Sequence, residues 1–305
     1  MAFSLASLVA LTGMIILLRQ GEDRGVVDKN IFRIADQSAI DRVELCRAQD
    51  TVALQYDGVR WRVNGGYDAE SRLVTVLFAT LAQAEPRRKA PESLQDSLRN
   101  QLKLDGVLVN LFEGGKKVKS FYAGGDQQKS AAYFMDDEGN PYLMAIPGYR
   151  VYVSGIFELD ESGWKEKRIF NFNWRNFKGL SARLADERQD FVVQPGDAGF
   201  EVAGIDLVDT TRLNDYLDAV SLLRATQFIP HGYSAKYDSL LLAPPALSIE
   251  ITDLGDRSYY LRLFAPLAGD RYVLGETGNQ EAVLFERQVL NPILKGKDYF
   301  RAKAP

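Results

Sequence analysis

The chain carries the same pattern twice. Three segments of its first half recur in the second half at offsets of 139 or 140 residues: Trp61-Arg-Val-Asn-Gly65 with Phe200-Glu-Val-Ala-Gly204, Val107-Leu-Val-Asn-Leu111 with Leu247-Ser-Ile-Glu-Ile251, and Gly139-Asn140 with Gly278-Asn279. An internal repeat decides the architecture of a chain before any local signal does. The 305 residues are enough for two domains of ordinary size. The sequence therefore predicts two tandem copies of one small domain.

Rare residues and net charge exclude several functional classes. The chain contains one cysteine, Cys46, and one histidine, His231. A single cysteine excludes an intramolecular disulfide and a cysteine-only zinc site. The net charge of −4 argues against a general nucleic-acid binder, which carries a basic footprint. The two copies share no nucleophile or metal cluster, which favours a scaffold protein over an enzyme. We expect no catalytic residue, no bound metal and no cofactor.

An apolar segment lies at the N-terminus. Residues 2–18 carry no charge and would reach about 26 Å as a helix, the lower limit for spanning hydrocarbon. A transmembrane anchor, a cleaved signal peptide and a buried core helix all fit this segment. The sequence Leu17-Leu18-Arg19-Gln20 is a poor cleavage site, and residues 21–30 have the composition of a polar linker. We expect residues 1–20 to form an anchor that contacts the lipid bilayer through residues 2–18.

The charges beside this segment give a weak signal for orientation. Arg19, Arg24 and Lys29 follow the apolar run, and no Lys or Arg precedes it. The positive-inside rule, taken literally, places the body of the protein in the cytoplasm. Large domains translocate largely regardless of charge, however. A further hypothesis is that the natural start lies upstream of Met1 and adds a basic region.

Both predicted modules combine strands with a helix. In the first, residues 31–150, apolar and polar residues alternate in short runs, as in half-buried strands. Apolar residues then recur every three or four positions from Ala69 to Ala84, which predicts a helix. The second, residues 190–305, repeats this order, with a helix from Thr211 to Ala225. The pattern predicts an α+β fold in which each module is a mostly antiparallel sheet covered by one helix.

The segment between the modules, residues 151–189, is rich in aromatic and basic residues. From Trp164 to Lys178 it holds five basic residues and one acidic residue. Aromatic residues and arginine are enriched at protein interfaces. The candidate partner-binding residues are Trp164, Arg168, Phe170, Phe172, Trp174, Arg175 and Phe177. Alternatively, these rings pack the junction between the modules. Base stacking is disfavoured by the acidic net charge.

The same segment carries a resemblance to a known family. Residues 147–155 (PGYRVYVSG), Phe157 and residues 168–177 (RIFNFNWRNF), together with the Trp61 module and its helix, resemble the DUF4340 family in its Bacteroidetes-type form. The resemblance covers most of the chain after residue 30. It implies a membrane-anchored extracytoplasmic protein, often encoded beside gliding-type ABC transporter components. It supplies no catalytic residue, and it favours a body that faces the periplasm.

Other polar residues have simpler explanations than a site. Asp136-Asp137-Glu138-Gly139 could offer oxygen ligands to a hard cation, but it lacks the spacing of a calcium loop and is typical of a hairpin turn. His231 has no evident partner in the sequence. Cys46 lies in a predicted strand, where a small buried residue is the simpler interpretation.

Three functional hypotheses follow from these observations. The first is a non-catalytic, single-pass subunit of an inner-membrane envelope complex, associated with an ABC transporter, whose partners are other membrane or envelope proteins. The second is a periplasmic protein that binds a small ligand or glycan in the cleft between the modules, next to Trp164 and Trp174. The third is an enzyme that uses carboxylates alone, for which no Asp or Glu pair stands out.

Overall fold

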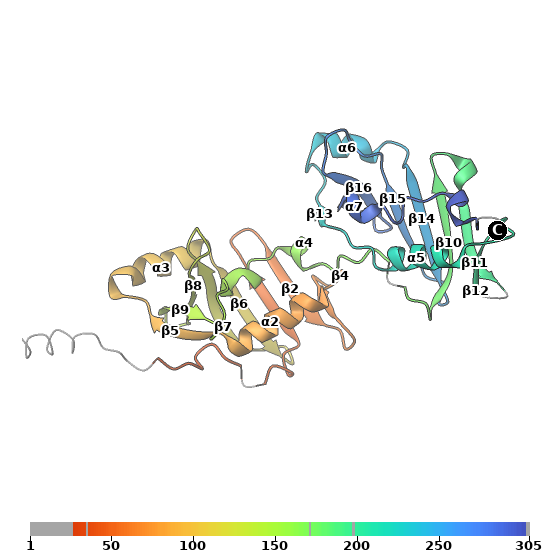
Figure 1. Cartoon of the computed structure of the whole chain (residues 1–305). Coiled ribbons are helices and arrows are strands. Elements are labelled where there is room, and N and C mark those ends of the chain that lie inside the picture. Colours follow the sequence, from red (N-terminus) through yellow and green to blue (C-terminus); the bar gives the residue numbers. More distant parts are fainter. Residues whose placement is uncertain (1–26, 35, 171, 197–198, 303–305) are drawn as a thin grey trace, which may run out of the picture. The chain divides into compact units, whose positions relative to one another are not determined.

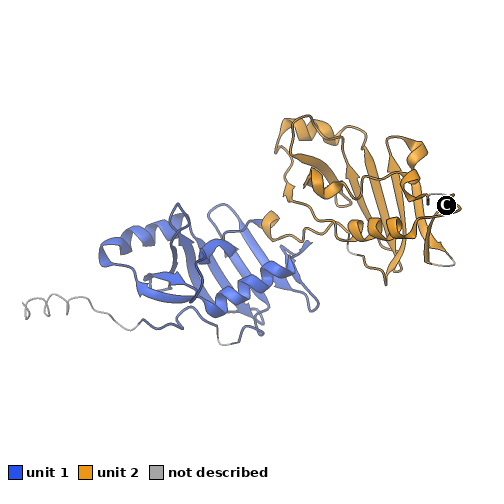
Figure 2. Ribbon diagram, viewed as in Figure 1, with its two compact units in different colours: residues 1–160 blue, residues 161–305 orange. Residues whose placement is uncertain are grey.

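The computed structural model describes residues 27–302 except 35, 171 and 197–198. The chain divides into two compact units, residues 1–160 and residues 161–305 (Figure 2). The predicted anchor, residues 1–20, lies outside the described residues. Among the described residues, no helix combines the length and the apolar character needed to cross a bilayer.

Unit 1 is built on one antiparallel sheet. Its strands are β1 (Arg42–Cys46), β2 (Thr51–Tyr56), β3 (Trp61–Val63), β4 (Tyr67–Asp68), β5 (Glu85–Lys89), β6 (Val107–Glu113), β7 (Lys116–Gly125), β8 (Ala132–Met135) and β9 (Pro141–Ala145). They are arranged in the order β4-β3-β2-β1-β6-β7-β8-β9-β5. The last strand in this order, β5, comes from the middle of the unit 1 sequence and forms one edge of the sheet.

Unit 2 is also built on one antiparallel sheet. Its strands are β10 (Phe177–Leu184), β11 (Phe191–Gly196), β12 (Gly199–Val202), β13 (Gln227–Ile229), β14 (Leu247–Asp253), β15 (Ser258–Leu263), β16 (Tyr272–Thr277) and β17 (Ala282–Glu286). Their order is β12-β11-β10-β14-β15-β16-β17-β13. Except for β4, this order matches that of unit 1 strand for strand. The α+β prediction is confirmed, and the strand order supports two copies of one fold.

The register of the strands agrees with two of the three sequence matches. Val43 in β1 pairs with Leu54 and Leu111, and Leu180 in β10 pairs with Val193 and Ile251. Leu111 and Ile251 are 140 residues apart, as the sequence match requires. The first strands of the two sheets are therefore also equivalent, although no sequence match included β10.

The third sequence match is wrong by two residues. Met135 pairs with Pro141 across the β8–β9 turn, and Glu276 pairs with Ala282 across the β16–β17 turn. Each turn has its positive φ at the same place: Gly139 has φ 85° and Gln280 has φ 61°. Gly139 therefore corresponds to Gln280 and not to Gly278. The shared glycine and asparagine misled the alignment because glycine occurs at several positions of tight turns.

In its described residues each unit has two main helices, where the sequence predicted one. Unit 1 has α2 (Ser71–Gln83) and α3 (Glu92–Leu104), and unit 2 has α5 (Thr210–Ser221) and α6 (Ala235–Leu241). The short helices are α4 (Glu161–Trp164), α7 (Arg287–Leu290), η1 (Val153–Ile156), η2 (Glu187–Gln189) and η3 (Lys297–Phe300). The sequence did not predict α3, because Leu102 is the only buried residue of this helix. A helix that is mostly exposed has little apolar periodicity to detect.

In unit 1 the two main helices cover opposite faces of the sheet. Phe78 of α2 contacts Trp61, whose ring lies on the same face as buried Val63 in β3. Leu102 of α3 lies close to Gly124 in β7, which faces away from the neighbouring core residue Ala123. Figure 1 shows α2 crossing its sheet and α5 crossing the other sheet in the same way. Among the described residues, α3 contacts β6, β7 and β9, and part of the face opposite α2 is left without a helix.

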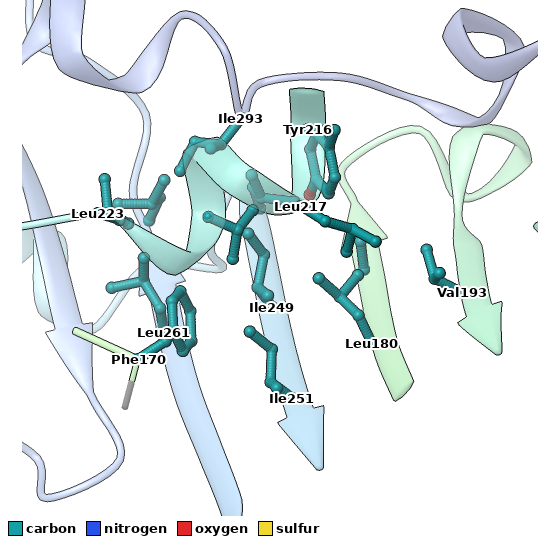
Figure 3. Close-up of a cluster of buried hydrophobic side chains, with 14 of the residues drawn as sticks. Phe170, Leu180, Val193, Tyr216, Leu217, Leu223, Ile249, Ile251, Leu261 and Ile293 are labelled. Atoms are coloured by element: carbon teal, nitrogen blue, oxygen red, sulfur yellow. The ribbon is translucent and has the colours of Figure 1, made fainter. Parts of the chain in front are cut away.

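The core of unit 2 lies between α5 and its sheet (Figure 3). The helix buries one stripe of residues at three- and four-residue spacing: Leu213, Tyr216, Leu217 and Val220. Below it lie Leu180, Ile249 and Ile251, which come from adjacent strands and are at most 2% exposed. Burying each such side chain contributes roughly 1.5–3 kcal/mol, so this layer supplies much of the stability of the unit.

Tyr216 is an exception within this apolar core. Its side chain is 1% exposed, and its hydroxyl has no hydrogen-bond partner among the described residues. Burial raises the pKa of its phenol, so the group stays neutral. An unpaired buried hydroxyl costs about 1–3 kcal/mol. We therefore expect Tyr216→Phe to raise the free energy of unfolding by about 1 kcal/mol, measured by urea denaturation. A decrease of that size would show that the hydroxyl has a stabilising partner.

Each sheet is preceded by an irregular segment that packs an aromatic residue into the core. We call these segments straps: strap 1 is residues 28–41 and strap 2 is residues 161–176. The ring of Phe32 in strap 1 lies 5.5 Å from that of Phe121 in β7. Phe170 in strap 2 is 0% exposed and belongs to the same core cluster as Leu261 in β15; Figure 3 draws both side chains. Phe121 and Leu261 occupy equivalent register positions, so the straps are equivalent.

This equivalence corrects the predicted bridge, residues 151–189. The boundary between the compact units falls at Asp160 and Glu161, inside that segment. Its last part contains β10, which pairs with β11 on one side and β14 on the other. The sequence Ile169-Phe170 in strap 2 repeats Ile31-Phe32 in strap 1 at an offset of 138 residues. None of the three sequence matches covers this segment, because the loops around β10 differ in length from those around β1.

Candidate functional site

Most of the aromatic residues proposed as a partner surface are buried in unit 2. Trp164 and Phe170 are 0% exposed, Phe172 is 6% exposed and Phe177 is 4% exposed. The rings of Phe172 and Phe177 lie 5.2 Å apart. A partner cannot reach these four side chains while unit 2 is folded. They pack the interior of unit 2, which corrects the prediction that they form a partner-binding surface.

The other three residues of that set lie on the surface of unit 2. Trp174 is 44% exposed, and its indole Nε1 donates a hydrogen bond of 2.7 Å to Asp218. Arg168 and Arg175 are exposed. Arg168 is held near Arg224 because the backbones of the two residues form an isolated β-bridge.

The acidic turn after β8 is a hydrogen-bonded turn. The Asp136 carboxylate accepts hydrogen bonds from the backbone N and the side-chain Nδ2 of Asn140, at 2.7 and 3.2 Å. Burial raises the pKa of the Tyr142 phenol, and a hydrogen bond to Asp136 adds to this effect. Among the described residues, no three His, Cys, Asp or Glu side chains are grouped to hold a metal ion. His231 is exposed in its loop, and Cys46 is half-buried.

The part of the unit 1 sheet that neither helix covers has an unusual composition. We call it the open face and define it by Glu44, Cys46, Leu108, Asn110, Ser120 and Tyr122. These residues alternate along β1, β6 and β7 with the core residues, so they point away from α2. Leu108 pairs with both Cys46 and Tyr122 in the sheet register, which places the three side chains in one row.

A second row on the open face is polar and hydrogen-bonded. Asn110 pairs with Glu44 on one side and with Ser120 on the other. The Ser120 hydroxyl donates a hydrogen bond of 2.8 Å to Asn110 Oδ1, and Asn110 Nδ2 lies 3.7 Å from the sulfur of Cys46. Asn110 is only 7% exposed. These contacts fix the orientation of its amide, so the polar row is rigid.

The open face ends in a hollow of about 360 Å³. Leu108, Ser120 and Tyr122 line it from the sheet, Arg99 and Lys103 from α3, and Asp136 to Gly139 from the turn after β8. Arg99 Nε donates a hydrogen bond of 2.9 Å to the Gly139 carbonyl, which ties α3 to that turn. The hollow therefore has a partly apolar floor and charged groups of both signs at its rim.

The second copy of the fold provides a control for this surface. By register, Arg183, Ser248 and Arg262 in unit 2 occupy the positions of Cys46, Leu108 and Tyr122. Arg262 forms an ion pair with Glu276, which occupies the position of Met135. The corresponding face of unit 2 thus carries exposed arginines at two of these positions, together with exposed Val192 and Tyr260 elsewhere on the face. The core pattern is shared by the two units, whereas this one face differs between them.

The family comparison covers parts of both units. The family described as domain of unknown function (DUF4340) matches residues 61–241. The chain belongs to the DUF4340 family. The match begins at β3 and ends at α6, so it includes strap 2 but not the first strands of unit 1. No curated protein and no solved structure matches the chain. Membership of the family confirms the resemblance found in the sequence and assigns no activity to the open face.

The open face was not predicted, although the sequence contains a signal for it. Leu108 lies in a segment that the repeat search had already aligned with its counterpart in unit 2, where Ser248 takes its place. Comparing the outward positions of the two copies would have shown that Leu108 and Tyr122 of unit 1 stand where unit 2 has Ser248 and Arg262. The location of the hollow depends on α3, which the sequence did not predict.

Proposed function

We propose that this DUF4340 protein is a non-catalytic, membrane-anchored subunit of an envelope complex, and that the open face of unit 1 binds a partner protein. The observation that supports this proposal is the difference between the two copies. A folding unit that only needed to be stable would have no reason to place Leu108 and Tyr122 where its twin places Ser248 and Arg262. Aromatic and apolar side chains at the centre of a surface, with charges at its rim, are typical of protein interfaces.

The partner is a polypeptide segment of defined chemistry. It offers an apolar side chain to the floor formed by Leu108 and Tyr122, and polar or charged groups to the rim. Lys103 at the rim forms no ion pair with another described residue, so it is available to a carboxylate of the partner. The uncharged apolar run, residues 2–18, supports a single-pass anchor in the inner membrane. The family resemblance favours a body in the periplasm. An ABC transporter is the proposed complex.

We expect Tyr122→Arg, which copies Arg262 of unit 2, to weaken the complex by about 30-fold or more, because it removes an aromatic contact worth about 2 kcal/mol. The tagged full chain is purified from membranes in mild detergent, and the partner retained per chain is quantified. Val192→Arg is the matched control, since Val192 lies on the corresponding face of unit 2 and is 42% exposed. Thermal unfolding of both variants checks that each is folded. Equal retention of the partner by wild type and Tyr122→Arg would contradict the proposal.

A small ligand in the hollow is the second candidate, and the volume of the hollow supports it. About 360 Å³ falls within the range of ligand pockets, and Ser120, Arg99 and Asp136 supply polar groups. From the sequence, we expected such a ligand to bind next to Trp164, but this residue is buried in unit 2. A thermal-shift screen with envelope glycans at millimolar concentration distinguishes the two candidates. A shift that Tyr122→Arg abolishes would favour the ligand over the protein partner.

A further inference from the structure

The edge strand β5 carries a basic patch. Arg87, Arg88 and Lys89 are exposed, and none of the three forms an ion pair with another described residue. Strap 1 adds Lys29 and Arg33, whose side chains both approach the Glu85 carboxylate, at 2.9 and 3.7 Å. One carboxylate balances at most one of these two cations. The edge therefore presents an excess of positive charge, even with Asp28 and Glu92 in the neighbouring sequence.

The second copy of the fold lacks these charges on its edge strand. The strand equivalent to β5 is β13, Gln227–Ile229, which contains no charged residue. Both strands are sheet edges with the same place in the fold, so the fold itself does not require the charges. Lysine on an edge strand also discourages edge-to-edge pairing, but that requirement would apply equally to β13. The charges on the edge strand are specific to the unit that follows the apolar run, whereas Lys29 has a counterpart in strap 2, Lys167.

The chain length keeps this patch near the apolar run. Lys29 lies at the β5 edge and is only eleven residues beyond Leu18, the last residue of that run. Eleven residues span at most about 40 Å when fully extended. Through the contact of Lys29 with Glu85, the β5 edge is therefore held within about 40 Å of the end of the apolar run.

We propose that the basic edge of unit 1, formed by Lys29, Arg33, Arg87, Arg88 and Lys89, binds the anionic headgroups of the membrane in which the chain is anchored. This inference rests on the anchoring part of the proposed function. Basic residues beside a membrane anchor are attracted to anionic lipid, and each one near the surface favours the bound state by roughly fivefold. Contact at this edge orients unit 1 on the membrane, because β5 lies at one end of the sheet order.

The full chain is reconstituted into nanodiscs of phosphatidylcholine alone or with phosphatidylglycerol. Amine acylation of Lys29 and Lys89 is followed by mass spectrometry, with exposed Lys117 as the internal reference. We expect acylation of Lys29 and Lys89 to slow by fivefold or more in the anionic discs only, and high salt to remove the effect. Arg87→Gln with Arg88→Gln should abolish the protection. Arg183→Gln with Arg188→Gln, which removes two exposed arginines from unit 2, should leave it intact.

The outcomes separate this inference from the anchoring on which it rests. Equal acylation rates in neutral and anionic discs, from a chain that enters both, would overturn the lipid contact and leave the anchor standing. A chain that enters no disc and stays in solution without detergent would overturn the anchor. Protection that persists in the Arg87 and Arg88 variant would show that another surface contacts the lipid.

Discussion

Phe170→Ala is expected to lower the free energy of unfolding of unit 2 by about 3–5 kcal/mol. Phe170 is 0% exposed and belongs to the core cluster of that unit, as Leu261 does (Figure 3). Removing its ring deletes a large apolar contact and leaves a cavity that the surrounding strands cannot fill, because protein interiors are close-packed. A loss of this size is a large fraction of the stability of an ordinary domain.

Urea unfolding followed by tryptophan fluorescence measures this effect. Trp61 is the one tryptophan of unit 1, so a Trp61→Phe background leaves Trp164 and Trp174 to report on unit 2. Leu254→Ala is the control, since Leu254 is 65% exposed and its loss should cost less than 1 kcal/mol. If Phe170→Ala also cost less than 1 kcal/mol, strap 2 would not be part of the core of unit 2.

The equivalence of the straps extends this expectation to unit 1. Phe32 is 3% exposed, and its ring contacts Phe121, Phe134 and Tyr142 edge-on at 5.4–5.7 Å. It performs in unit 1 the role that Phe170 performs in unit 2. A short irregular segment is thus a structural part of each copy, which is why the boundary between the units lies before the second strap and not after it.

The sequence predicted the parts of the fold in which the apolar pattern is dense. The helix expected from Ala69 to Ala84 is α2, Ser71–Gln83, because its apolar residues recur on one face. The aligned segments Val107–Leu111 and Leu247–Ile251 are the central strands β6 and β14, in register. Alternation of buried and exposed residues has the period of a strand, so it identifies such segments directly.

The sequence did not predict the parts of the fold that depend on distant contacts. The strand β5 contains Pro86 and three consecutive basic residues, and its pairing with β9 is set by tertiary structure. Strap 2 has the composition of an interface but is buried, because composition alone does not distinguish the inside of a domain from a binding surface. The open face could be recognised only from the strand registers of both units.

The second prediction with a large expected effect is that unit 2 needs strap 2 in order to fold. The fragment 161–305 contains strap 2 and all eight strands of unit 2, whereas the fragment 177–305 has the same strands but lacks the strap. The strap contributes the buried side chains of Trp164, Phe170 and Phe172. Losing three such side chains removes several kcal/mol of apolar burial, which is comparable to the whole stability of a domain.

Urea denaturation of these two fragments, followed by near-ultraviolet circular dichroism and tryptophan fluorescence, is the most direct test that the protein is two complete copies of one fold. We predict a single cooperative transition for 161–305, coincident by both probes, and no cooperative transition for 177–305. Cooperative unfolding of 177–305 at the same urea concentration as 161–305 would contradict the account. Failure of 161–305 to fold would also contradict it, because a complete copy of the fold should be stable on its own.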